Sequence, residues 1–241
     1  MSSNKGIVRT QLTNCSYQSV QEYLGLDKDN IKMTSLRPVH HWKTPTLVLL
    51  DLYVSSITEV NEKAQTFSPH IYVEMGWVNE FTKWNATDFC GITFMSVPKE
   101  MLWIPDITVM EIIRTEFSTN EAPFLKMLSE GFVNGGQAFT LTSVCKMDLY
   151  RFPFDTQSCT LTLQSSLHTI EEFHIEAYSN ASSLTAHSKE FFVNKGEWEL
   201  ISINMSKSFI ESSGRVWDQL IYTVLIPSYI VILCGTVMVL L

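Results

Sequence analysis

Basic residues are scarce in this sequence. Lysine and arginine together number 17 against 25 aspartates and glutamates, which gives a formal net charge of -8 and an isoelectric point near 5.2. A protein that binds the phosphates of DNA or RNA needs clustered basic side chains, and the chain has no such cluster. We therefore predict no nucleic-acid partner. Hydrophobic residues make up 45% of the chain, which is ample for a packed core.

Motifs of catalysis and cofactor binding are also missing. The sequence contains no nucleophile elbow, HExxH pair, phosphate-binding loop or dinucleotide fingerprint. The best local group of metal-type side chains is His168, Glu171, Glu172 and His174. Their spacing fits no standard zinc pattern, and adjacent residues of a strand point to opposite faces. The sequence thus predicts neither an enzyme nor a protein that holds a metal or a cofactor.

Charge disappears near the C-terminus. No lysine or arginine follows Arg215, and residues 219–241 carry no charged side chain. As a helix, Leu220–Leu241 would be roughly 33 Å long, close to the ~30 Å hydrocarbon core of a bilayer. We therefore predict a membrane helix over 220–241, after an extracellular domain over 1–219. Residues 220–224 could instead complete the preceding strand and leave about eighteen residues to span the bilayer.

Four Asn-X-Ser/Thr sequons indicate the compartment. They lie at Asn14, Asn85, Asn180 and Asn204. Acceptor sites for N-linked glycans in this number are typical of a lumenal or extracellular surface. Residues 1–9 contain no apolar core of a signal peptide. The expectation of an extracellular domain therefore depends on the sequons.

Residues with period-two hydrophobicity dominate the middle of the chain. From Thr46 onward, Val48, Leu50, Leu52 and Val54 would share one face of a strand. Similar patterns recur at Ile71–Trp77, Phe132–Val144, Thr160–Gln164 and Glu197–Asn204. Many short strands without alternating helices predict an all-β, antiparallel β-sandwich.

Local signals add a helix and a turn to this fold. Ser16–Leu24 begins with a hydroxyl residue, has an apolar face and is followed by Gly25, which predicts a short N-terminal helix. Asn134-Gly135 lies between two expected strands and suits a tight hairpin turn.

Two pairs of cysteines are expected to be bonded. Cys145 and Cys159 enclose a loop whose interior contains Phe152-Pro153-Phe154-Asp155, an apolar tip followed by a carboxylate. We predict a disulfide between them, since closure of such a loop stabilises the fold by about 3 kcal/mol. A second bond between Cys15 and Cys90 is a further hypothesis, because neither residue has another evident partner in an oxidising compartment. Cys234 should remain a free thiol.

The loop between Cys145 and Cys159 resembles the signature of the Cys-loop, or pentameric ligand-gated ion channel, receptors, and the similarity extends over nearly the whole chain. It is strongest to serotonin type-3 receptor subunits. The matching stretches are Asn14–Ser16 (NCS), Phe81–Asn85 (FTKWN), Leu102–Asp106 (LWIPD), Leu167–Ile170 (LHTI) and Gly196–Leu200 (GEWEL). Cys90–Ile92 is similar to the accessory subunits of that group. The resemblance implies a β-sandwich extracellular domain, five of which form a ring with agonist sites between adjacent subunits.

The resemblance also implies a box of aromatic side chains that holds a protonated amine by cation-π attraction. Matched position by position, it assigns Tyr72, Glu74 and Phe124 to the complementary face of such a site. It places Glu111 in the loop after LWIPD and Trp217 in the capping loop. For Tyr72, Phe124 and Trp217, ordinary packing is the alternative role.

The chain departs from the family pattern at the principal face. Ser166 stands where the serotonin-binding subunit has its central tryptophan, and Met110 stands where that subunit has an asparagine. The missing ring removes the best cation-π partner. We therefore expect this face to bind an amine weakly and the chain to act as an accessory subunit.

A second departure concerns gating. The resemblance assigns Phe152, Pro153, Phe154 and Asp155 to a gating loop, which in serotonin-type relatives faces a run of arginines before the first membrane span. Here Asp218–Ser228 contains no arginine. Asp155 is therefore expected to lack its cationic partners.

The resulting prediction is a subunit of an extracellular-ligand-gated ion channel in the lipid bilayer of the plasma membrane, with a postsynaptic location expected. Its partners would be other channel subunits, in a homo- or hetero-pentamer, and a small neurotransmitter-like amine whose binding couples to cation conduction in the full assembly. One alternative is a membrane-tethered, non-conducting assembly or binding partner of full-length subunits. The other is an adhesion-type sandwich such as an immunoglobulin domain, whose cysteines pair distant strands.

Overall fold

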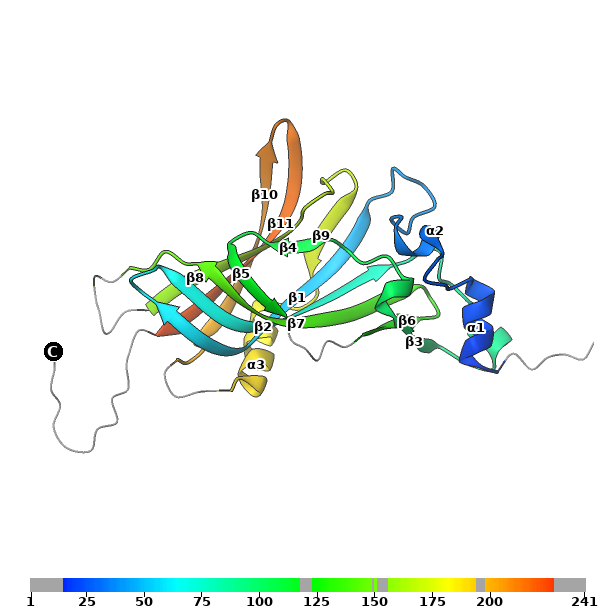
Figure 1. Ribbon diagram of the computed structural model, residues 1–241, viewed down its shortest axis with the longest axis horizontal. Helices are drawn as coiled ribbons and strands as arrows, with labels where there is room; N and C mark the ends of the chain where they lie inside the picture. The colour runs from blue at the N-terminus through cyan, green and yellow to red at the C-terminus, as the bar shows by residue number, and fades with distance from the viewer. Residues whose placement is uncertain (1–14, 118–122, 149, 151–155, 194–197, 228–241) are drawn as a thin grey trace, which may run out of the picture.

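The protein folds as two β-sheets packed face to face, with short helices at the periphery (Figure 1). The computed structural model describes residues 15–117, 123–148, 150, 156–193 and 198–227. One sheet has the strand order β3-β6-β7-β2-β1-β9, with β5 also paired to β7, and the other has the order β10-β11-β8-β4. All neighbours are antiparallel except β1 and β9, which are parallel. The predicted all-β sandwich is confirmed.

The seven-stranded sheet consists of β1 (Thr46–Asn61), β2 (Thr66–Val78), β3 (Phe94–Pro98), β5 (Ile112–Phe117), β6 (Phe124–Leu128), β7 (Phe132–Val144) and β9 (Phe173–Ala177). The four-stranded sheet consists of β4 (Ile107–Val109), β8 (Thr156–Ser165), β10 (Ser202–Ser212) and β11 (Arg215–Pro227). The predicted strand over 197–204 therefore begins later than expected, at Ser202.

Side chains that alternate along β1 form the centre of the core. Val48, Leu50, Leu52 and Val54 are all fully buried, as their period-two spacing predicted. The phenol of Tyr222, on β11, crosses the core and donates a 2.9 Å hydrogen bond to the carbonyl of Leu50. This bond satisfies a buried hydroxyl and links the two sheets.

In the described residues, three α-helices and two 3₁₀ turns cover the rims of the sandwich: α1 (Tyr17–Leu24), α2 (Ile31–Thr34), η1 (Ala86–Phe89), η2 (Lys99–Met101) and α3 (Ala181–Phe191). The Ser16 hydroxyl caps α1 by accepting from the Ser19 N–H at 3.0 Å, and Gly25 ends the helix with a φ of 63°. The predicted N-terminal helix is confirmed.

Both predicted disulfides are present. Cys145 and Cys159, with Cα atoms 5.1 Å apart, join the end of β7 in one sheet to β8 in the other. Cys15 and Cys90, with Cα atoms 5.2 Å apart, attach the start of α1 to the end of η1. Because Cys145 and Cys159 pair with each other, the adhesion-type alternative is excluded. The tip residues 152–155 lie outside the described residues.

The hairpin predicted at Asn134-Gly135 is wrong. These residues lie inside β7, opposite Gly76 and Met75 of β2. The chain turns earlier, between β6 and β7, where Gly131 has a φ of 86° that other residues rarely adopt. At Gly135 a Cβ would collide with the side chain of Leu125, so this glycine permits the close approach of two strands.

The predicted start of the membrane helix at Leu220 is wrong, and the alternative, in which residues 220–224 complete the preceding strand, is confirmed. Residues 220–227 continue β11, paired with β8 on one side and, through Leu225, with β10 on the other. Leu220, Tyr222, Val224 and Ile226 alternate into the core, so this apolar run has the period of a strand. Residues 228–241 are outside the described residues. None of the helices in the described ranges is long and apolar enough to cross a bilayer.

A buried carboxylate links the two sheets at one edge of the sandwich. The side chain of Asp218, on β11, is 1% exposed. Its Oδ2 accepts a 3.0 Å hydrogen bond from the Ile175 N–H at the free edge of β9, and lies 3.2 Å from the ammonium of Lys207 on β10. His174 Nδ1 is 3.6 Å from the same oxygen, and Glu176 contacts Lys207 at 3.1 Å. One side chain thus ties β9 to the hairpin of β10 and β11.

Asp218→Ala should therefore destabilise the protein strongly. It leaves the Ile175 N–H buried without an acceptor and removes the partner of the Lys207 ammonium, so the free energy of unfolding should fall by about 2–3 kcal/mol. Glu176→Ala removes only the exposed partner of Lys207 and should lower the free energy of unfolding by less than about 1 kcal/mol. Urea unfolding followed by circular dichroism measures both, and equal losses for the two variants would contradict the role given to Asp218.

Candidate ligand-binding faces

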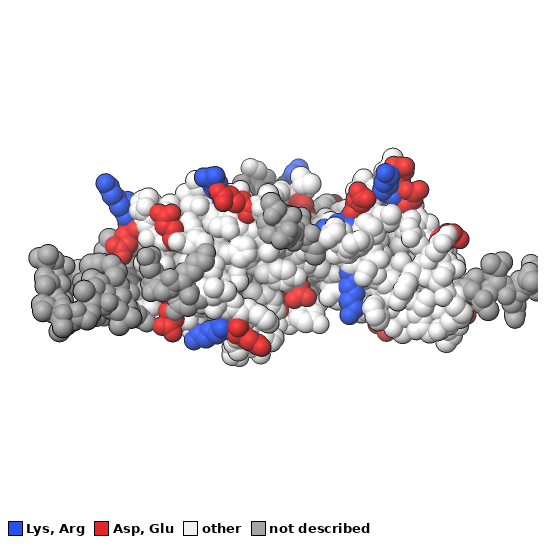
Figure 2. Space-filling view, turned by 60° about the horizontal axis from the view of Figure 1, so that its bottom comes forward, with Lys and Arg blue, Asp and Glu red and all other residues white. Residues whose placement is uncertain are grey.

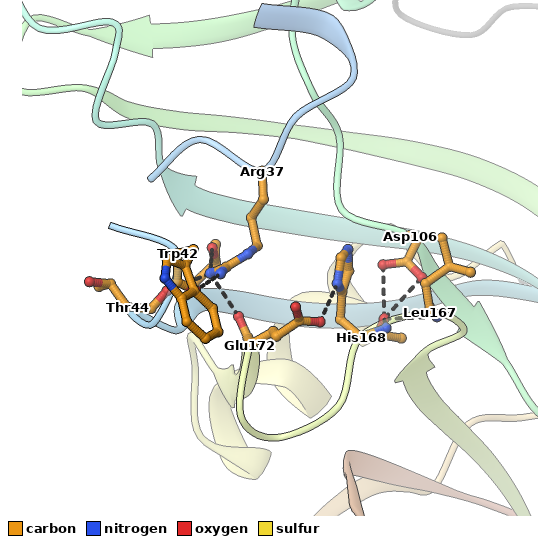
Figure 3. A network of polar contacts seen from close by, with 9 residues as sticks. Arg37, Trp42, Thr44, Asp106, Leu167, His168 and Glu172 are labelled. Carbon is orange, nitrogen blue, oxygen red and sulfur yellow. Dashed lines mark hydrogen bonds and ion pairs between the residues drawn. The ribbon is translucent and has the colours of Figure 1, made fainter. Parts of the chain in front are cut away.

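The turn that carries Ser166 is fixed by Asp106, the last residue of the LWIPD motif (Figure 3). The Asp106 carboxylate accepts from the Ser165 hydroxyl at 2.8 and 2.9 Å and from the Leu167 N–H at 2.8 Å. The Ser165 oxygen in turn accepts from the His168 N–H at 2.8 Å. Residue 166 is thereby held between two anchored neighbours.

His168 and Arg37 fix the next part of the same loop (Figure 3). The His168 imidazole lies 3.1 Å from a Glu172 carboxylate oxygen and stacks on Phe173 at 5.8 Å. The Arg37 guanidinium donates to the carbonyl of Glu172 at 3.0 Å and to the carbonyl of Trp42 at 2.6 Å. These residues scaffold the loop. Sequence reasoning did not assign any of these contacts, although Asp106 was part of a recognised motif.

Ser166 and Trp217, both candidates for the principal face, lie just beyond the same end of the β8–β11 pairing. This pairing ends at Gln164 and Gln219; Ser166 directly follows β8, and Trp217 precedes Gln219 on β11. The Ser166 hydroxyl is exposed and lies 3.2 Å from that of Thr108. Trp217 is half-buried in the β10–β11 hairpin, which protrudes from the sandwich (Figure 1). This face carries one indole and no ring at position 166.

Glu111 lies apart from that pair. Its carboxylate accepts from the Thr162 N–H at 2.8 Å and from the Thr162 hydroxyl at 2.6 Å. Thr162 is four residues from Ser166, which is about 13 Å along an extended strand. The Glu111 side chain therefore ties the β4–β5 turn to β8 and does not reach Ser166.

Tyr72, Glu74 and Phe124, the candidates for the complementary face, gather around Gly136. Glu74 pairs with Gly136 across β2 and β7, and Phe124 begins β6, the strand that pairs with β7 on its other side. A Cβ at Gly136 would collide with the phenol of Tyr72, so this ring lies over the glycine. Tyr72 is 39% and Phe124 54% exposed. The sheet thus presents two aromatic rings and a carboxylate on one outward face.

A second layer of side chains supports Tyr72 and Glu74 from β1. The Tyr53 ring lies 6.4 Å from that of Tyr72, and its hydroxyl donates to Asp51 at 3.0 Å. Asp51 is buried and also accepts from the Ser179 N–H at 2.9 Å. Burial, followed by the nearby Asp51 charge, raises the pKa of Glu74. Burial, followed by the Glu74 charge, raises the pKa of Tyr72. Sequence reasoning did not identify Asp51 and Tyr53.

The two candidate sets face in different directions. Tyr72 points away from the sandwich interior, because its neighbours Ile71 and Val73 are buried between the sheets. Ser166 and Trp217 belong to the loops and hairpin of the other sheet. The two sets therefore do not share one face of this domain.

Three of the four sequons lie in the described part of the chain, and their asparagines are exposed. Asn85 and Asn180 use their amide oxygens to cap η1 and α3, by accepting from the Thr87 and Ser183 N–H groups. Asn204 lies on β10. Asn14 lies outside the described residues. Figure 2 shows acidic and basic side chains interspersed on one face, with wide uncharged areas between them.

The described residues form a β-sandwich that carries candidate ligand-binding side chains on both of its sheets. The chain belongs to the neurotransmitter-gated ion-channel ligand binding domain family, whose model matches residues 29–227. This is a family of receptor channels and not of enzymes.

Known relatives include serotonin and acetylcholine receptors. The chain is 36% identical over 181 residues to 5-hydroxytryptamine receptor 3A of Cavia porcellus, covering 75% of this chain and 36% of the relative. It is 33% identical over 189 residues to human 5-hydroxytryptamine receptor 3B, covering 78% and 42%. It is 26% identical over 212 residues to the mouse acetylcholine receptor subunit delta, covering 83% and 40%. The chain thus spans well under half the length of these relatives.

The raised pKa of Glu74 predicts a pH-dependent effect of Glu74→Gln. Folding disfavours the ionised carboxylate, so the contribution of this group to stability is present at acidic pH and is lost as pH rises through the raised pKa. Glu74→Gln should therefore raise the free energy of unfolding at pH 7 by about 0.5 kcal/mol, a value kept small by solvent screening. Below about pH 4, where the carboxyl is protonated in both states, the gain should vanish.

Thermal unfolding at pH 7 and pH 4 measures this difference. Glu116→Gln, at an exposed glutamate paired with Arg114 at 2.8 Å, is the matched control and should show no gain at pH 7. A gain for Glu74→Gln that persists at pH 4 would mean that its charge is not the cause.

Proposed function

We propose that this chain is a subunit of an extracellular-ligand-gated ion channel that contributes a complementary face to an amine site at a subunit interface. The observation that carries the proposal is the cluster of Tyr72, Glu74 and Phe124 on one outward face of the seven-stranded sheet. In this proposal the domain is extracellular, the channel lies in the plasma membrane and amine binding couples to cation conduction in the full assembly.

The chemistry of this face suits a protonated amine. The Tyr72 and Phe124 rings offer π-faces to a cation, an attraction of about 0.5–1 kcal/mol when exposed and about 2 kcal/mol when desolvated. Glu74 supplies a negative charge beside Tyr72. A neighbouring subunit packed over this face would exclude water and strengthen both interactions.

The principal face of the same chain is proposed to bind an amine weakly. Position 166 carries a hydroxyl in place of a ring, and Trp217 on β11 is the aromatic candidate of this face. The chain would therefore act as an accessory subunit, beside a neighbour that supplies a tryptophan at the corresponding position. The resulting ring would be a hetero-pentamer in which only some interfaces bind agonist.

The membrane and gating parts of the proposal concern residues outside the described ranges. We propose that the apolar segment after Pro227 enters the bilayer and that the 152–155 tip, closed by Cys145 and Cys159, contacts the membrane part of the channel. The alternative function is a membrane-tethered, non-conducting partner of full-length subunits. The absence of arginine between Asp218 and Pro227 favours this alternative, because coupling would lack its cationic residues.

Substitutions on the two faces should affect amine binding in opposite directions. In complexes of the full chain with the Cavia porcellus 5-hydroxytryptamine receptor 3A, Tyr72→Ala should weaken serotonin binding at mixed interfaces by up to about thirtyfold, the equivalent of about 2 kcal/mol. Ser166→Trp should strengthen binding at the other face by a similar factor at most. Radioligand binding to co-purified complexes measures both effects.

Tyr23→Ala, which removes an exposed tyrosine of α1, is the control and should leave binding unchanged. If the complexes form but neither Tyr72→Ala nor Ser166→Trp alters binding, the amine proposal fails. Current recordings from the same cells then separate a conducting subunit from a non-conducting partner.

A further inference from the structure

A cavity of about 350 Å³, partly open to solvent, lies between the two sheets and away from Tyr72 and Glu74. Its walls come from both sheets: Val73 and Met75 of β2 and Phe139 of β7 on one side, and Val109 of β4 and Leu163 of β8 on the other. Ile112 of β5 closes part of the rim. A single occupant of this cavity would contact both layers of the fold.

The lining is apolar with a few neutral polar groups. Among the described residues that line it there is no aspartate, glutamate, lysine or arginine. The hydroxyls of Thr108 and Thr115 and the amide of Gln137 are the polar groups at the wall. A protonated amine would find no counter-charge here, so the cavity differs in chemistry from the face around Tyr72 and Glu74.

The size and opening of the cavity suit a small ligand. Apolar cavities of about 150 Å³ already take up benzene or xenon, and small-molecule sites begin at about 300 Å³. Phe117, which is 62% exposed, pairs with Phe139 at 5.9 Å and gives the rim an aromatic edge. An apolar occupant would gain dispersion contacts with these walls.

We propose that this cavity binds a small neutral molecule that is largely apolar and carries one hydrogen-bonding group, such as a phenol. The apolar body would pack between the two sheets, and the polar group would bond to a threonine hydroxyl or to Gln137. The Thr108 hydroxyl, at the wall of this site, lies 3.2 Å from the Ser166 hydroxyl. A single hydrogen bond therefore connects the site to Ser166. The site lies within one subunit and does not require the amine site of the proposed function.

The test uses two adjacent residues of β5. Ile112 lines the cavity, whereas Ile113 faces outward with 59% exposure. Ile112→Trp should fill the rim, and Ile113→Trp adds the same indole to the same strand outside the cavity. The probe is 4-fluorophenol, followed by fluorine NMR with the detergent-solubilised full chain and a blank of detergent alone.

The unchanged chain and Ile113→Trp should bind the probe with equal affinity beyond the detergent blank, and Ile112→Trp should bind at least tenfold more weakly. The 4-fluorobenzylammonium cation should not bind to the cavity in any of the three proteins. Should Ile112→Trp fail to fold by circular dichroism, Thr115→Phe at the same wall replaces it with the same expectation. No binding beyond the blank, or equal binding by the filled and control variants, would overturn the proposal.

Discussion

The Asp218 carboxylate joins β9 and β11, two strands that are not connected by backbone hydrogen bonds within a sheet. β9 belongs to the seven-stranded sheet and β11 to the four-stranded sheet, so no ladder connects them. Asp218 bridges this gap by accepting from Ile175 and pairing with Lys207. Because Asp218 directly follows Trp217, the same contact sets where the β10–β11 hairpin leaves the sandwich. The position of the principal face therefore depends on a bond between the two layers.

The two outward faces differ in how their side chains are supported. Tyr72 lies on a glycine and beside Tyr53, in the middle of a continuous sheet. Ser166 lies in a loop that Asp106 holds from the side. The sheet face carries aromatic and acidic groups, whereas position 166 on the loop face carries a hydroxyl within a well-anchored loop. This asymmetry is the physical argument for the proposed accessory role, in which a neighbour would supply the aromatic ring.

The sequence predicted features that depend on local periodicity and missed those that depend on distant partners. The caps of α1, the buried face of β1 and the pairing of Cys145 with Cys159 follow from nearby residues. The prediction of a turn at Asn134-Gly135 is wrong because Gly135 serves a different purpose: it makes room for the Leu125 side chain of another strand. The apolar run after Gln219 was assigned to a helix because length and hydropathy do not reveal that β8 and β10 pair with it. Likewise, the sequence alone does not reveal that Glu111 contacts β8 or that Asp106 contacts the end of β8 and the loop after it.

Photo-cross-linking from the outward face of β2 tests most directly whether this chain is a channel subunit that meets its neighbour there. Benzoylphenylalanine in place of Tyr72, in the full chain co-expressed with 5-hydroxytryptamine receptor 3A, should yield on illumination an adduct with the mass of one chain plus one receptor subunit. The same amino acid in place of Lys63, in the turn between β1 and β2, should yield far less. No adduct from position 72 when both proteins reach the same membrane, or equal adducts from both positions, would contradict the account.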